Sequence, residues 1–168
     1  MGRLTRLLKH RLFDDADARR ALPAAALDRL QAQVVTSEAA HSGEIRICVE
    51  AGLPLSYLWR NAPARQRAIA MFGKLRVWDT EHNNGVLVYL LLAEHRIEIV
   101  ADRGLNARVA PVAWAAMVER LRTALASGAF EEGLAAAISA ADELLLAHFP
   151  LPEGVKRLNE LPDAVVLL

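Results

Sequence analysis

Oxygen-bearing side chains gather in one short segment of the sequence, Asp79-Thr80-Glu81-His82-Asn83-Asn84-Gly85. It runs directly into seven apolar residues, 86–92. Clustered carboxylates and amides are the ligands that hard cations such as calcium and magnesium prefer. The segment is not an EF-hand, because its glycine stands at the seventh position and Leu90 occupies the twelfth, where a bidentate glutamate belongs. It can also be a solvated loop whose polar side chains bond backbone amides.

A second polar segment, Asp102-Arg103-Gly104, follows the apolar residues 97–100. Only four residues separate 86–92 from 97–100, and so short a connection forces an antiparallel hairpin. The end of the second strand then lies beside the start of the first. We therefore predict a rim of the sheet that holds a divalent cation, calcium or magnesium. Its candidate ligands are Asp79, Glu81, Asn83, Asn84 and Asp102, with Arg103 available to a phosphate or carboxylate. An Asp–Arg ion pair that closes a turn is the alternative.

Two strands other than 97–100 can be predicted from hydrophobic periodicity. Residues 86–92 have no polar alternate, which favours a central strand covered on both faces. Residues 44–50 alternate strictly, so we expect a strand with one less buried face. Cys48 falls on that outer face, without an activating cation or helix start, and is predicted to be inert. Glu94 lies in the hairpin turn, where its replacement by alanine should be nearly silent.

Helices are predicted where apolar residues recur at helical spacing. They begin at Pro23, near Pro63 with Asn61 as a candidate cap, at Pro111 and at Phe130. The resulting order is helix, strand, helix, hairpin, helix, helix. The expected fold class is α/β: an αβα sandwich with a small mixed sheet, an antiparallel hairpin, and helices on both faces.

The two ends of the chain differ from this central part, which we expect to be a domain over residues 23–149. Residues 1–22 are basic, and Leu4, Leu7, Leu8 and Leu12 share a helical face there. Such a helix can pack on its own domain or fray, or it can make a peripheral membrane contact. Residues 150–168 contain three of the seven prolines and predict an irregular tail, packed down by the final Val-Val-Leu-Leu.

Composition excludes several functional classes. The 168 residues include 20 basic and 20 acidic side chains, so net charge gives no reason to expect a nucleic-acid partner. A single cysteine excludes an internal disulfide and a thiol zinc site. No glycine-rich phosphate loop or Gly-x-Ser-x-Gly elbow is present, so we expect no organic cofactor and no triad hydrolase. Without a signal-peptide pattern or an apolar run of roughly 20 residues, a cytoplasmic protein is expected.

Three motifs resemble those of the TPM domain family, in the same order. They are Ser42-Gly43-Glu44-Ile45, then Asn84-Gly85-Val86-Leu87-Val88 with a hairpin and Gly104-Leu105, then Gly128-Ala129-Phe130-Glu131-Glu132-Gly133-Leu134. The resemblance covers about residues 24–149. It implies an αβα sandwich, a divalent-cation site by the sheet and an acid phosphatase activity. It also implies a role like that of family members in the bacterial envelope and the thylakoid lumen. The family often has an acidic residue after the leucine, where this chain has Asn106, and Asp102 stands earlier instead.

Two functions remain open. The first is a binding or interaction module that docks another protein, in envelope or membrane-protein maintenance, with a divalent-cation site at the loop rim. The second is a metal-dependent acid phosphatase acting on phosphomonoesters, in which a cation held by Asp79 and Asp102 polarises a phosphate and activates water. The second needs a positioned nucleophile or base, and no residue of the sequence identifies itself as one. We therefore prefer the first.

Overall fold

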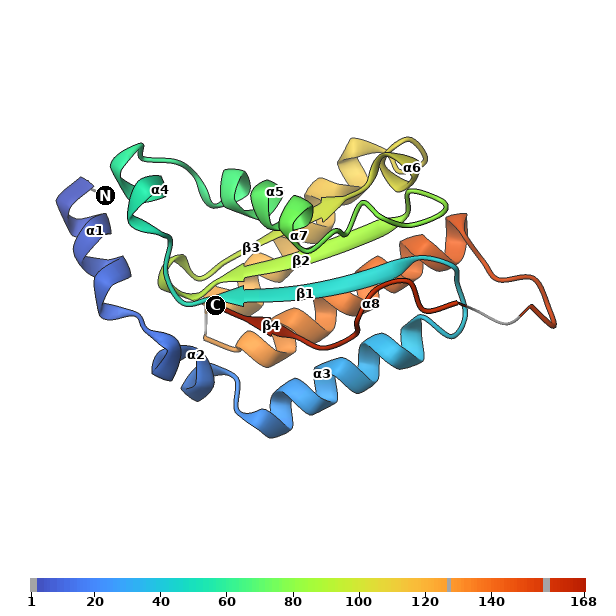
Figure 1. Cartoon of the computed structure of the whole chain (residues 1–168), viewed down its shortest axis with the longest axis horizontal. Helices are drawn as coiled ribbons and strands as arrows, with labels where there is room; N and C mark the ends of the chain where they lie inside the picture. Colours follow the sequence, from blue (N-terminus) through green and yellow to red (C-terminus); the bar gives the residue numbers. More distant parts are fainter. Residues whose placement is uncertain (1–2, 127, 156–157) are drawn as a thin grey trace.

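A computed structural model describes residues 3–126, 128–155 and 158–168 (Figure 1). Within these residues the strands form one four-stranded mixed sheet in the order β3-β2-β1-β4. β1 is parallel to both of its neighbours, whereas β2 and β3 are antiparallel. The strands are β1 (Glu44–Glu50), β2 (Gly85–Leu91), β3 (Arg96–Ala101) and β4 (Val166–Leu167).

The predicted hairpin is confirmed. Val88 lies opposite Ile99 in the antiparallel pair. The connection is a single 3-10 turn, η1 (Leu92–Glu94), followed by His95 in a left-handed conformation with φ 48°. Every residue of β2 is buried, as expected for a central strand with no polar alternate.

Helices cover both faces of the sheet, so the predicted αβα sandwich is confirmed (Figure 1). One face packs Ile45 and Val88 against α3, α7 and α8. The other packs Leu87 and Tyr89 against α4 and α5. The helices are α1 (Arg3–Leu12), α2 (Asp15–Ala21), α3 (Ala24–Ser37), α4 (Leu55–Trp59), α5 (Ala64–Lys74), α6 (Arg103–Asn106), α7 (Pro111–Ala126) and α8 (Phe130–His148).

The prediction of a less buried face on β1 is wrong, because all seven residues of that strand are buried. The polar alternates find partners instead of solvent. Arg67 of α5 donates from Nε and Nη2 to the Glu50 carboxylate at 2.6–3.1 Å, and the Tyr89 hydroxyl donates to Glu50 Oε2 at 2.5 Å. Cys48 is enclosed beside them, and burial raises the pKa of its thiol to about 12. An inert thiol therefore follows from enclosure and not from an outer position.

Several local expectations also need correction. Asn61 does not cap α5, which begins after Pro63 without a side-chain cap. Asn61 has φ 51° and accepts a hydrogen bond from Arg6. The tail is not wholly irregular, since Val166–Leu167 adds to the sheet as β4.

Glu94 is not an isolated turn residue either. Its Oε1 accepts from Arg6 Nε at 2.7 Å and lies 3.0 Å from His10 Nε2. Both partners belong to α1, so the hairpin turn anchors the N-terminal helix.

Candidate functional site

The hairpin brings the segment after β3 beside the loop that precedes β2, as its geometry predicted. Asp102 N–H donates to Gly85 O at 2.9 Å where β3 returns beside β2, and Gly104 N–H donates to Asn83 O at 2.9 Å. A Cβ on Gly104 would lie 2.5 Å from His82 O and 2.6 Å from Asn83 O. Only glycine therefore allows the segment after β3 to approach the loop before β2 so closely.

Two oxygens at this rim are buried without a hydrogen-bond partner in the part of the chain that the structure describes: Asn84 Oδ1 and Asp102 Oδ2. The other polar atoms of these side chains are bonded. Asn84 Nδ2 donates to Ser42 Oγ at 3.2 Å, and Asp102 Oδ1 accepts from Arg103 N–H at 2.7 Å. Buried acceptors are normally satisfied, because removing one from water without a partner costs a few kcal/mol. Two unpaired oxygens at one end of a sheet fit the donor chemistry of a hard cation.

The remaining predicted residues take different positions. Asp79 and Glu81 are exposed. Arg103 Nε donates to Asn83 Oδ1 at 3.0 Å, and among the described residues it forms no ion pair with Asp102. The contacts thus join Asn83 and Asn84 to Asp102 and Arg103. The carboxylates of Asp79 and Glu81 take no part in them.

A carboxylate group that the sequence did not suggest lies near the start of β1. One oxygen each of Glu38, Glu44 and Asp163 lies within 4.8 Å of the others. Glu38 accepts from the N–H of Ile45, and Glu44 accepts from backbone N–H groups of the tail at 3.1 and 3.4 Å. The partly buried guanidinium of Arg46 supplies positive charge beside these carboxylates. We interpret the group as the structural attachment of the tail, because backbone donors and a cation already serve it. Three segments far apart in sequence build it, so no local pattern reveals it.

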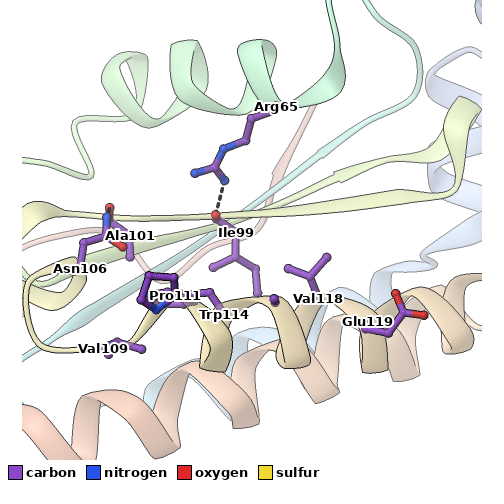
Figure 2. Close-up of a pocket in the computed structure, with 10 residues that line it drawn as sticks. Arg65, Ile99, Ala101, Asn106, Val109, Pro111, Trp114, Val118 and Glu119 are labelled. Atoms are coloured by element: carbon purple, nitrogen blue, oxygen red, sulfur yellow. Dashed lines mark hydrogen bonds between the residues drawn. The ribbon is translucent and has the colours of Figure 1, made fainter.

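A cavity of about 560 Å³ lies beside β3, between α5 and α7 (Figure 2). Arg65 reaches down from α5 and donates to Ile99 O, while Asn106 Nδ2 donates to Ala101 O at 2.6 Å. Trp114 Nε1–H is buried without an acceptor among the described residues. The lining is mainly apolar: Arg65, Ile99, Ala101, Asn106, Val109, Pro111, Trp114, Ala115, Val118 and Glu119.

β3 is an edge strand, and this cavity lies along its outer side. The bond from Asp102 N–H to Gly85 O sets the alternation of the antiparallel ladder. Val100 and Glu98 therefore direct their backbone groups to β2, whereas Ile99 and Ala101 direct theirs to the cavity. Arg65 and Asn106 occupy the carbonyls there, where a further strand would otherwise pair. We call this feature the edge groove.

The TPM domain model matches residues 16–144, which is most of the chain. The chain belongs to the TPM domain family. The solved structure of BA42, a protein from the psychrophilic bacterium Bizionia argentinensis, is similar at 25% sequence identity and a TM-score of 0.75. That similarity covers 87% of this chain and 94% of BA42. A search of curated proteins finds no match. The TPM domain match begins after α1, so this helix lies outside it.

Proposed function

We propose that this TPM-domain protein is a binding module whose loop rim takes a divalent cation and whose edge groove takes a segment of another protein. The observation that carries the proposal is the pair of buried, unpartnered oxygens, Asn84 Oδ1 and Asp102 Oδ2. We extend the proposal to a role in envelope or membrane-protein maintenance, which the family resemblance supports.

The two side-chain oxygens, Asn84 Oδ1 and Asp102 Oδ2, would fill only part of the coordination shell of a divalent cation. Calcium takes six to eight oxygens and magnesium six, usually with several waters, so two side-chain oxygens would leave positions for other donors. A carboxylate from a partner protein is one such donor. The cation would add positive charge beside Asp102, and Arg103, already held on Asn83, could meet an acidic group next to it.

The edge groove supports the partner half of the proposal. An extended segment can pair with an edge strand through its main chain while alternate side chains enter apolar pockets. Ile99 and Ala101 offer their outward N–H groups, since Arg65 and Asn106 already bond the two carbonyls, and Trp114 and Val118 offer the apolar wall. Asn106 connects the two features, because it follows Asp102 on α6 and lines the groove.

The metal-dependent acid phosphatase remains the alternative, and it rests on the same oxygens. A cation beside Asp102 would polarise a phosphate, yet a nucleophile or base would also be required. The lining of the edge groove includes Glu119 as its one carboxylate, at the opposite end from Ala101 and Asn106 in Figure 2. Binding is therefore the better supported activity.

Titration of the protein with calcium chloride and with magnesium chloride tests the proposal, followed by backbone amide shifts and thermal unfolding. We expect shifts confined to residues 79–85 and 101–105, together with a rise in melting temperature. Asp102→Asn and Asn84→Ala should abolish both responses, whereas Asp28→Asn, at an exposed position on α3, should leave them unchanged. Asp79→Asn measures whether the exposed loop carboxylate adds to the affinity.

A titration without shifts at the rim would overturn the cation proposal. Hydrolysis of p-nitrophenyl phosphate that requires the cation and is lost in Asp102→Asn would favour the phosphatase instead. The Asp102→Asn variant must retain its folded circular dichroism spectrum for either result to count.

A further inference from the structure

The N-terminal helix α1 attaches to the protein through its polar side. Arg6 and His10 both contact Glu94, at 2.7 and 3.0 Å. His10 Nδ1 also accepts from Leu53 N–H at 3.0 Å, and Arg6 Nη2 donates to Ala62 O at 2.8 Å. The imidazole of His10 is completely buried by this packing. The side of α1 that faces the protein is therefore the hydrogen-bonding side.

The opposite side of α1 is apolar and faces outward. Leu4, Leu8 and Leu12 recur at every fourth position, so they share one helical face. They are 79%, 61% and 78% exposed. A surface helix of a globular protein normally buries its apolar stripe and exposes its charges. Helix α1 has the reverse orientation, and three exposed leucines on one face of it therefore need an explanation.

The neighbouring helix also carries exposed apolar side chains. α4 lies next to α1 at the same end of the molecule (Figure 1). Its Trp59 is 77% exposed, and Leu55 is nearly half exposed. We call the leucine stripe of α1 together with Leu55 and Trp59 the apolar end.

The surroundings of the apolar end are cationic. Residues 1–13 and 51–67, which include α1, α4 and the first turn of α5, contain seven of the 20 basic residues and none of the 20 acidic ones. Arg6 forms an ion pair with Glu94 of the hairpin turn, and Arg67 forms one with Glu50 of β1. Lys9 and Arg11 flank the leucine stripe on α1, and Arg60 follows Trp59. The whole chain has zero net charge, yet these segments carry only positive charges.

We propose that the apolar end docks on a membrane surface that contains anionic lipids. Apolar side chains with flanking Lys and Arg are what a helix lying in the lipid interface presents, and tryptophan is favoured at that depth. An anionic headgroup layer complements Lys9, Arg11 and Arg60 beside the exposed apolar side chains, and the exposed Asp14 after α1 bounds that surface. No helix among the described residues is long and apolar enough to cross a membrane, so α1 would lie in the plane of the interface.

Sedimentation with lipid vesicles tests the proposal on the full-length protein. Vesicles of equal parts phosphatidylglycerol and phosphatidylcholine should bind it, and pure phosphatidylcholine should bind it much more weakly. Each cation near an anionic surface contributes about fivefold to partitioning, so the double variant Lys9→Gln/Arg11→Gln should lose about 25-fold. Leu8→Gln should lose about tenfold or more, since a leucine leaves the apolar layer.

The matched control is Val112→Gln on α7, which removes an equally exposed apolar side chain away from α1 and α4. It should bind vesicles like the unmodified protein. Trp59 emission should shift to shorter wavelength on binding, and Trp59→Phe should remove that shift. Equal binding to both vesicle types, no binding to either, or an unchanged affinity of Leu8→Gln would overturn the proposal. A stable dimer that Leu8→Gln dissociates would overturn it too, and would assign the apolar end to a second copy of the chain.

Discussion

Replacing Glu94 by alanine should release α1 from the body of the protein. The Glu94 carboxylate holds two side chains of that helix, Arg6 and His10, through the same oxygen. Its side chain is only 16% exposed, so solvent cannot fully replace these contacts. The other contacts of Arg6, with Asn61 and Ala62, are hydrogen bonds without a charged partner.

The size of the effect follows from the titration of the carboxylate. The hydrogen bond from His10, with a further contribution from Arg6, lowers the pKa of Glu94 from 4.5 to about 2. Each unit of pKa corresponds to about 1.4 kcal/mol, and partial exposure reduces the total. We expect a loss on the order of 2–3 kcal/mol. Hydrogen bonds to charged groups, at about 1.5–3 kcal/mol each, lead to the same range.

Amide hydrogen exchange of α1 measures this loss directly, because the helix can detach without global unfolding. Protection of the α1 amides should fall by about 30- to 150-fold in Glu94→Ala. Glu132→Gln, at an exposed carboxylate of α8, is the matched control and should leave α1 unchanged. Faster tryptic cleavage within residues 3–11 should accompany the loss.

The pH dependence has a definite direction. Because the folded pKa of Glu94 lies below its unfolded value, the ionised carboxylate stabilises the docked helix. That stabilisation is complete above pH 4.5 and is lost as the pH falls from there towards 2. In Glu94→Ala this part of the acid dependence of α1 protection should be absent. Unchanged protection of α1 in the variant, or an acid dependence equal to that of the unmodified protein, would refute the reasoning.

Three further measurements test the sheet. Leu90→Ala should destabilise the protein by about 2–5 kcal/mol in urea denaturation, since Leu90 is fully buried in β2, and a loss below about 1 kcal/mol would contradict the packing. Cys48 should resist a thiol reagent at pH 8 until the protein unfolds, because its pKa is raised to about 12; rapid labelling of the native protein would count against its burial. The amide of Ile99 should exchange faster than that of Val100, since Ile99 faces the edge groove and Val100 faces β2.

The sandwich could be predicted because its signals are local. A seven-residue apolar run favours a fully covered strand, and a four-residue connection between two strands can only return antiparallel. The burial of β1 could not be predicted in the same way. Glu50 is a charged residue of β1, and whether its carboxylate faces water depends on Arg67, which lies on helix α5. β4 was missed because two residues carry too little periodicity to distinguish a strand from a tail.

The candidate rim shows the same division. Hairpin geometry correctly placed Asp102 beside the loop before β2. The sequence could not tell which oxygens of that loop are enclosed, because enclosure depends on packing contacts such as those of Ser42 and Gly104. Asn84 looked no different from Asn83, yet one carries a buried unpaired oxygen and the other holds Arg103.

The pairing of β4 with β1 has a consequence for the order in which the protein assembles. The tail bonds to Glu44 across 116 positions of the chain, from Glu160. Contacts so distant in sequence close slowly, because the entropy of a long loop must be lost before they form. During synthesis, the rest of the sheet can be complete while β1 still presents an unpaired edge. Until residues 158–168 arrive, that edge is open to another nascent chain, and pairing there is a route to aggregation.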